Sequence, residues 1–174
     1  MPDVLISESL SNLAKDVFEK NNIKVDFNTE LSPSELQEII KNYDALVVRS
    51  ATKVTKEIIE AGDKVKIICR AGAGVDNVDL IAAKKKNIIV MNTPGGNTNA
   101  TAEHTISLLL SLYRSIPKAN TSTHQGLWEK KNFKGLELKG KKIGLIGFGN
   151  VAQRVAEIAK SFDMEVFVFS KSFE

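Results

Sequence analysis

The feature that most constrains the fold of this chain is the alternation of short apolar segments with amphipathic ones. Short apolar runs with the length of strands stand at residues 4–6, 45–48, 65–69 and 88–90, and residues 24–27 alternate polar and apolar side chains, as a strand does. Between them, apolar residues recur at helical spacing over residues 10–18, 33–40, 56–61 and 78–86. Parallel strands need crossover helices, which then cover the faces of the sheet. The pattern predicts an α/β fold in which residues 1–96 form one flavodoxin-like lobe, with helices on both faces of a parallel sheet.

Residues at the predicted helix ends support this interpretation. Ser32 precedes a proline at a first helical position, which is a frequent start of a helix. Thr55 can cap the helix over residues 56–61, and Gly62 would end it. Asp79 lies near the positive end of the helix predicted over residues 78–86.

A segment rich in turn formers, Asn-Thr-Pro-Gly-Gly-Asn-Thr at residues 92–98, marks a boundary between residues 1–96 and 97–174. A leucine-rich helix over residues 101–115 follows and is stopped by Pro117. Its apolar residues cover more than one face, so we expect it to be buried between lobes or against a partner chain. Residues 118–138 are predicted to be irregular, with Trp128 as their anchor.

The sharpest motif is G-x-G-x-x-A at residues 147–152, placed between a strand at residues 142–146 and a helix at residues 153–162. This is the context that a dinucleotide site requires. Gly147 permits the tight turn, Gly149 lets the backbone approach a pyrophosphate, and Ala152 allows close packing of helix on strand. Free N–H groups and the helix dipole then hold the phosphates. The candidate cofactor-binding residues are Gly147, Phe148, Gly149, Asn150, Val151 and Ser170. A turn with only a structural role is the alternative.

The motif departs from the usual pattern at the end of the next strand, residues 165–169. An NAD site carries an acidic residue about 20 positions on, and here that place holds Ser170, followed by Lys171. Serine can bond a ribose hydroxyl or a phosphate, and lysine favours a phosphate. The sequence therefore allows the hypothesis that NADP is tolerated or preferred; a strand end that has simply drifted is the alternative.

Several segments together resemble a known family. Arg-Ala-Gly-Ala-Gly-Val-Asp-Asn-Val-Asp at residues 70–79 resembles the glycine-rich substrate loop of D-isomer-specific 2-hydroxyacid dehydrogenases. Residues 92–94, 102–103 and 138–149 are also similar to that family, while residues 48–52 and 126–131 look most like its D-3-phosphoglycerate dehydrogenases. The resemblance covers essentially the whole chain. It implies a substrate lobe, an inserted Rossmann domain of which residues 97–174 are the first part, ligands in the cleft, and NAD as cofactor.

The same resemblance assigns the candidate substrate-binding residues, which are Arg49, Ser50, Gly72, Ala73, Gly74 and Asn97. Arg49 stands at the carboxyl end of a strand and can bind a carboxylate or phosphate with a forked pair of hydrogen bonds. The glycine loop can offer backbone N–H groups to a carboxylate. A surface ion pair at Arg49 and a purely structural turn at the glycines are the alternatives.

Three further assignments follow. Arg70 is interpreted as a support for its own loop. By resemblance, Asn97 lines the cleft. Lys130 stands where phosphoglycerate enzymes often carry an arginine that contacts phosphate from the neighbouring subunit. Lysine keeps the charge there but not the fork, which weakens the prediction of a phosphorylated substrate.

The resemblance also implies that a histidine base, a glutamate and an arginine perform the reaction, all after the second Rossmann strand. We therefore expect no catalytic residue in this chain, which ends at Glu174, and no turnover by it alone. His104 is interpreted as a packed or interface residue and His124 as solvated. Because half a Rossmann sheet exposes an edge and an apolar surface, the isolated chain is expected to associate. A dinucleotide-binding scaffold without catalysis, or a degenerate gene product, is the competing interpretation.

Composition excludes several other classes. The net charge is only +3, with lysines spread among acids, so no basic stripe indicates nucleic acid. Cys69 is the only cysteine, which excludes an internal disulfide and a cysteine metal site. No apolar run approaches the roughly 20 residues that span a bilayer. We expect a cytoplasmic protein that binds a small anionic substrate, no nucleic acid and no membrane, and that pairs as a homodimer or with a complementing chain.

Overall fold

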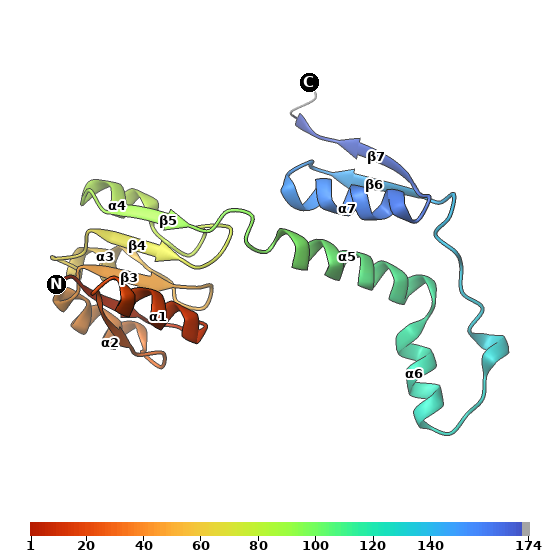
Figure 1. Ribbon diagram of the computed structural model, residues 1–174, viewed down its shortest axis with the longest axis horizontal. Coiled ribbons are helices and arrows are strands. Elements are labelled where there is room, and N and C mark those ends of the chain that lie inside the picture. The colour runs from red at the N-terminus through yellow and green to blue at the C-terminus, as the bar shows by residue number, and fades with distance from the viewer. Residues whose placement is uncertain (172–174) are drawn as a thin grey trace. The chain divides into compact units, whose positions relative to one another are not determined.

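The computed structural model describes residues 1–171, and the chain divides into two compact units. Unit 1 spans Met1–Gly96 and unit 2 begins at Asn97. Figure 1 shows a sheet flanked by helices in the first unit. In the second unit it shows a long helix, an arm formed by residues 114–141, and a smaller sheet with its own helix.

Unit 1 is built on a five-stranded parallel sheet in the order β2-β1-β3-β4-β5. The strands are β1 (Asp3–Ile6), β2 (Lys24–Phe27), β3 (Ala45–Val48), β4 (Ile67–Arg70) and β5 (Ile89–Asn92). All four strand pairs are parallel. This is the flavodoxin-like order, in which ligands bind at the carboxyl ends of the strands. The α/β fold predicted from the alternation of apolar segments is confirmed.

Four helices and one 3-10 turn connect these strands. They are α1 (Asn12–Lys20), α2 (Pro33–Ile39), η1 (Ile40–Asn42), α3 (Lys56–Ala61) and α4 (Leu80–Lys85). The larger core cluster lies on one face of the sheet and joins Leu5, Leu46 and Ile68 of the strands to Leu36 of α2 and Ile58 of α3. On the other face, Val4, Ile6 and Val47 pack with Phe18 of α1.

The second face of this sheet is only partly covered, so the prediction of helices over both faces is wrong at its β5 side. Ile89 is 59% exposed and Met91 is 51% exposed. Their register partners on β4 are Ile67 and Cys69, and Cys69 packs with the cluster on the α1 face. A helix is about 10 Å wide and strands lie about 4.8 Å apart, so the single helix α1 covers roughly two strands.

Helix capping in unit 1 follows the sequence with one exception. The N–H of Glu35 donates to Ser32 Oγ, and the N–H of Ser32 donates to the Glu35 carboxylate at 2.8 Å, which completes a capping box. Asp79 caps α4 by accepting from the N–H of Ala82 at 2.9 Å. Thr55 occupies the N-cap position of α3 as predicted, but its side chain makes no cap hydrogen bond.

Among its described residues, unit 2 contains a two-stranded parallel sheet, three α-helices and one 3-10 helix. Its elements are α5 (Thr98–Tyr113), α6 (Ile116–His124), η2 (Lys130–Asn132), β6 (Lys142–Ile146), α7 (Asn150–Ser161) and β7 (Glu165–Phe169). Helix α5 packs on α7 around Ala102, Ile106 and Val155. The two strands begin and end where the sequence predicts them.

The segment between α5 and β6 differs from the prediction of an irregular stretch anchored by Trp128. Pro117 does not only stop the first helix. It also lies in the first turn of α6. The N-cap residue before this turn, Ser115, has a φ of 51°, in the left-handed region, and there the chain changes direction. Trp128 is 86% exposed and therefore anchors nothing within the described chain. The buried anchor is Leu138, which packs with Ala159 and Met164.

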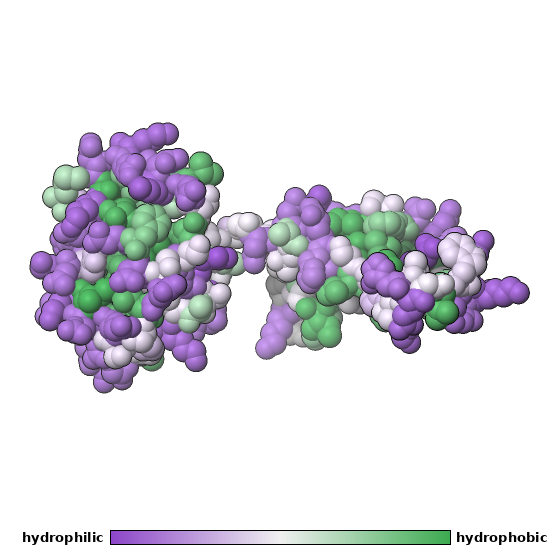
Figure 2. Space-filling model, turned by 90° about the horizontal axis from the view of Figure 1, so that it is seen from below, coloured by the Kyte–Doolittle hydropathy of each residue, from purple (hydrophilic) through white to green (hydrophobic). Residues whose placement is uncertain are grey.

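Within the described chain, helix α5 is buried on one face only, so its burial between lobes or against a partner chain stays a prediction. Leu108 and Leu112 are exposed, whereas Ala102 and Ile106 face α7. Ile146, Phe167 and Phe169 of the small sheet are exposed as well. On the face drawn in Figure 2, hydrophobic residues reach the surface of both units among hydrophilic ones.

Candidate functional site

The glycine turn of unit 2 connects β6 to α7 with open space in front of it. Gly147 has a φ of 90°, which a residue with a side chain adopts only under strain, and Gly149 is the N-cap of α7. A Cβ added at Gly147 or Gly149 would meet no heavy atom within 4 Å. The packing of the described chain therefore does not require a glycine at position 149, whereas the close approach of a diphosphate would.

The N–H groups at the start of α7 can serve as anion donors. The first amides of a helix have no partner inside it and lie at the positive end of its dipole. Val151 packs its side chain in the α5–α7 cluster, so only its N–H can face a ligand. Asn150 is exposed, while the carbonyl of the half-buried Phe148 accepts from Gln153 Nε2 at 3.1 Å.

The end of β7 is tied to this turn. The N–H of Gly147 donates to the carbonyl of Phe169 at 2.7 Å. Ser170 follows directly and is half-buried. Ser170 therefore follows a residue that is hydrogen-bonded to the glycine turn, at the end of the second strand of the β-α-β unit. This is the position at which a dinucleotide site carries its ribose-binding residue.

In unit 1, the loop after β3 presents Arg49 and Ser50, both exposed. Among the described residues, Arg49 takes part in no salt bridge; its Nη1 lies 3.4 Å from the carbonyl of Ser9. The surface ion pair considered as an alternative for Arg49 is therefore absent from residues 1–171, and the guanidinium remains available to an anion.

Glu8, which sequence reasoning missed, organises this loop. Its Oε1 accepts from the N–H of Arg49 at 2.8 Å and of Thr52 at 2.9 Å, and its Oε2 accepts from the N–H of Ala51 at 3.1 Å. Partial burial opposes the ionisation of Glu8, but these hydrogen bonds outweigh it, so the pKa of the carboxyl lies below its ordinary value. The available signal was an acidic residue just after β1, at the sheet edge where ligands bind.

The glycine loop holds the other side of the same segment. Asn77 Nδ2 donates to the carbonyls of Arg49 at 2.7 Å and Thr52 at 2.6 Å. Arg70 Nε lies 3.3 Å from the Arg49 carbonyl, and Arg70 Nη1 pairs with Asp76 at 2.6 Å. The interpretation of Arg70 as a loop support agrees with these contacts.

Gly72 and Gly74 lie against the Arg70 guanidinium, and neither has a positive φ. A Cβ at Gly74 would stand 3.0 Å from Arg70 Nη1 and 3.1 Å from Asp76 Oδ1. These close contacts leave little room for a side chain at Gly74, whereas a Cβ at Gly72 would lie 3.4 Å from Arg70 Nε, in ordinary contact. Within residues 1–171, the N–H groups of Ala73 and Gly74 donate to no protein acceptor, and both residues are exposed.

The remaining candidates lie in unit 2. Asn97 is the exposed N-cap of α5, and its side chain makes no cap hydrogen bond. Lys130 opens η2 and is exposed. His104 and His124 are both exposed, on α5 and in the last turn of α6. Exposure agrees with the interpretation of His124 as solvated; His104 is not packed within the described chain.

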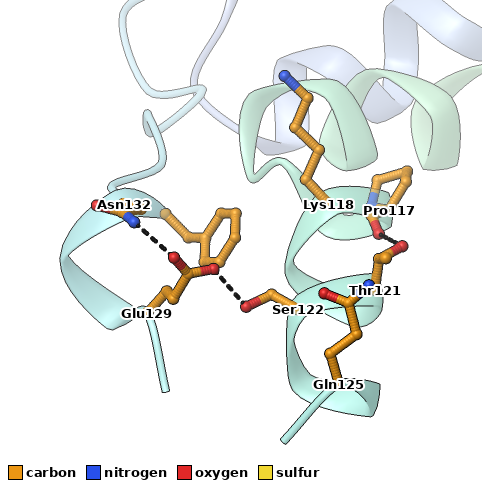
Figure 3. A pocket seen from close by; sticks show the side chains of 8 residues that line it. Pro117, Lys118, Thr121, Ser122, Gln125, Glu129 and Asn132 are labelled. Carbon is orange, nitrogen blue, oxygen red and sulfur yellow. Dashed lines mark hydrogen bonds between the residues drawn. The ribbon is translucent and has the colours of Figure 1, made fainter. Parts of the chain in front are cut away.

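Two surface pockets add little chemistry of their own. One of about 610 Å³ lies beside the Arg49 loop and includes Ser50, Asp76 and Asn77 in its wall. The other, of about 520 Å³, lies between α6 and η2 (Figure 3). Its polar groups bond to one another, since Glu129 accepts from Ser122 at 2.6 Å and from Asn132 at 3.0 Å. These hydrogen bonds connect α6 to η2, so the residues that line the second pocket have a structural role within the arm.

Two kinds of feature are missing from residues 1–171. No helix there is long and apolar enough to cross a membrane. The same residues contain no group of three or more His, Cys, Asp or Glu side chains that could hold a metal ion.

Comparison with known proteins adds sequence and structural relatives. Residues 4–168 match the catalytic-domain model of the D-isomer specific 2-hydroxyacid dehydrogenases. A D-3-phosphoglycerate dehydrogenase of Archaeoglobus fulgidus is 47% identical over 166 residues, 95% of this chain and 32% of the relative. A hydroxypyruvate reductase of Thermotoga maritima is 52% identical over 139 residues, 80% of this chain and 45% of the relative.

One solved structure is likewise similar to this chain. The NAD+-bound 3-phosphoglycerate dehydrogenase of Entamoeba histolytica superimposes with a TM-score of 0.80 at 35% identity, over 98% of this chain and 54% of that one. The chain therefore spans about a third to a half of the length of these relatives.

Proposed function

This chain belongs to the D-isomer specific 2-hydroxyacid dehydrogenase family, and on that premise we propose that its protein transfers a hydride between a nicotinamide dinucleotide and C2 of a D-2-hydroxy acid. The observation that carries the proposal is the strand–turn–helix of residues 142–161, with its open glycine turn and the free helix start behind it. A helix start of this kind binds a diphosphate through backbone N–H groups.

The cofactor proposed is NAD, held at Gly147, Phe148, Gly149, Asn150 and Val151. When bound, its nicotinamide supplies the hydride acceptor or donor. The solved relative contains NAD+. Ser170 follows β7 where NAD sites carry an acid, so nothing at that position repels a 2′-phosphate. We therefore propose that NADP is also accepted.

The substrate proposed is 3-phospho-D-glycerate. Support comes from the name of the relative that is 47% identical, and from two anion-binding features of unit 1. Arg49 offers a forked donor, and the N–H groups of Ala73 and Gly74 can hold a carboxylate. Gly72 keeps that loop close to Arg70. In this proposal Ser50 and Asn97 contact the substrate through their hydroxyl and amide groups.

A second substrate class is favoured by one observation. The relative that is 52% identical is named a hydroxypyruvate reductase. A carboxylate without a phosphate would use the same Arg49 and glycine-loop donors. Lys130, which lacks the guanidinium fork, fits this alternative as well as the phosphorylated substrate.

Catalysis needs a general base that none of the described candidate residues supplies. We propose that residues 1–171 bind substrate and cofactor, and that the proton-transfer residues implied by the family resemblance lie outside this chain. A dinucleotide-binding scaffold without turnover is the competing function for the chain alone.

A second copy of the chain is the proposed partner, with a complementing chain as the alternative. The support is that α5, α6 and the following segment carry exposed large apolar side chains, which contact with a second chain would bury. They are Leu108, Leu112, Ile116, Leu127 and Trp128.

Paired glycine substitutions test the dinucleotide site. Gly149→Ala adds one methyl group that the protein can accommodate but a diphosphate cannot, so the affinity for NADH should fall at least tenfold in calorimetric titration. Gly144→Ala is the matched control, since a Cβ there also meets nothing within 4 Å and the residue lies on β6, before the turn. Equal NADH affinity of Gly149→Ala and the parent would contradict the proposed site.

A further inference from the structure

The direction in which Arg49 points depends on the backbone of residues 49–52. The side chain is exposed, and its one described protein contact is the long 3.4 Å approach to the carbonyl of Ser9. A guanidinium on an unrestrained loop would lose conformational entropy each time it bound an anion. Whatever fixes this loop therefore contributes to anion affinity without touching the anion.

Glu8 fixes this loop by accepting hydrogen bonds from its backbone N–H groups. One carboxylate oxygen takes the N–H groups of Arg49 and Thr52, and the other takes that of Ala51. Three N–H donors converging on two oxygens match an ionised carboxylate, whereas a side-chain amide has a single acceptor oxygen. Hydrogen bonds to a charged acceptor are also stronger than those to a neutral one.

The position of Glu8 is itself fixed by its neighbour. Ser7 is buried, and its N–H donates to the carbonyl of Val47 at 3.1 Å, which extends the pairing of β1 with β3. Its hydroxyl lies 3.2 Å from the hydroxyl of Thr52. Glu8 is therefore presented to the loop from a rigid strand end.

Asn77 holds the acceptor side of the same loop. Its Nδ2 donates to the carbonyls of Arg49 and Thr52, and no other orientation of the amide would serve two acceptors. Within the described chain, the N–H of Ser50 is the one backbone N–H between Arg49 and Thr52 that has no protein partner.

We propose that Glu8 is a positioning residue for anion binding, which holds residues 49–52 in the single conformation from which Arg49 grips the acid group of the substrate. The inference rests on the proposed function, because it takes Arg49 as the substrate anchor. Although Glu8 is negative, its charge is directed to three N–H groups of the loop. The lowered pKa of its carboxyl means that Glu8 stays ionised further into the acid range than an ordinary glutamate.

The test uses the ¹⁵N-labelled chain and four proteins: the parent, Glu8→Gln, Glu8→Asp and the control Glu38→Gln, an exposed glutamate on α2. The amide resonances of Arg49, Ala51 and Thr52 are followed with pH, and the affinity for 3-phospho-D-glycerate and for NADH is measured by titration. In the parent and in Glu38→Gln, these three resonances should titrate together with a carboxyl group.

We expect Glu8→Gln to abolish that titration, to speed hydrogen exchange at Ala51 and Thr52, and to weaken 3-phospho-D-glycerate binding at least tenfold, about 1.4 kcal/mol. Glu8→Asp keeps the charge on a shorter stem and should recover part of the affinity. NADH affinity should be unchanged in all four proteins, which shows that unit 2 folds, and unchanged amide resonances of the buried strand residues Leu46 and Ile68 show that unit 1 folds.

The possible failures are distinguishable. Unchanged 3-phospho-D-glycerate affinity in Glu8→Gln overturns the positioning role, whether or not the loop amides become less protected. If the parent itself binds no 3-phospho-D-glycerate or hydroxypyruvate, the proposed substrate role of Arg49 fails, and the role of Glu8 with it. Loss of NADH binding in Glu8→Gln would indicate general unfolding and overturn a local role.

Discussion

The two units use the same construction, parallel strands joined by helices, but they bury their apolar side chains to very different extents. In unit 1, Leu46 on the central strand β3 is 1% exposed, beneath helices on one face. In unit 2, Ile146 on β6 is 92% exposed. A sheet of two strands gives each apolar residue few neighbours, and at least three strands or a covering layer are needed for independent stability.

The alternation of side chains along the strands explains which residues are exposed. Ile143 and Leu145 face the α5–α7 cluster. Phe167 and Phe169 are the register partners of Gly144 and Ile146 and lie on the opposite face, which no described element covers. The comparison shows that the sheet of unit 1 is buried more completely than that of unit 2, whose second face carries exposed apolar side chains within the described residues.

The largest expected effect is a core truncation in unit 1. Leu46→Ala should lower the free energy of unfolding by about 2–5 kcal/mol, because it removes buried methyl groups and leaves a cavity. Urea unfolding followed by circular dichroism measures this change. Ile146→Ala in unit 2 is the counterpart and should change it by less than about 0.5 kcal/mol. Similar costs in the two variants would break the distinction between the units.

A smaller effect on stability, but a visible one on association, is expected on the open face of unit 2. Ile146→Thr combined with Phe169→Thr removes exposed apolar area and should reduce self-association in sedimentation velocity, with stability changed by about 0.5 kcal/mol or less. Leu13→Thr, at an exposed leucine on α1, is the control and should leave association unchanged. An equal reduction in both proteins would mean that the open face of the β6–β7 sheet does not mediate self-association.

The smallest expected effect is on pH dependence. Among the described residues, the carboxyl groups with a lowered pKa all lie in unit 1; they are Glu8, Glu35, Asp44 and Glu57. At Glu8 burial works against ionisation and hydrogen bonds overcome it, whereas hydrogen bonds are the leading cause at the other three.

A folded-state pKa below the unfolded one gives stability that is present above the unfolded pKa and is lost as the pH falls through the folded pKa. Unit 1 should therefore lose stability from about pH 5 downward, by a modest amount because these groups are largely exposed. Hydrogen exchange resolved by residue, at two pH values, measures it in each unit. A larger loss in unit 2 would contradict the assignment of these groups.

Much of the fold could be predicted because local signals and packing agree. The bounds of β2 follow from its alternation of polar and apolar residues, and those of β3, β6 and β7 from short, largely apolar segments. Helix α6 escaped prediction because Thr121, Ser122 and Thr123 favour turns. In the structure the two threonines instead donate to carbonyls one turn back, Thr121 to Pro117 at 3.1 Å and Thr123 to Ala119 at 2.9 Å.

The site was only partly accessible for a related reason. The glycine turn at residues 147–152 is local, so its residues reveal it. Glu8 lies 41 positions from Arg49 along the chain, and only the pairing of β1 with β3 brings the two together. The exposure of Trp128 likewise depends on which other parts of the molecule pack against the arm, and the residues near Trp128 in the sequence do not reveal them.

The crowding around Gly74 limits how this protein can change over evolutionary time. A methyl group at that position would require Arg70 Nη1 and Asp76 Oδ1 to shift by a few tenths of an ångström, and these two atoms form the ion pair that supports the loop. We therefore expect a substitution at position 74 to be accepted more readily when position 70 or 76 changes with it.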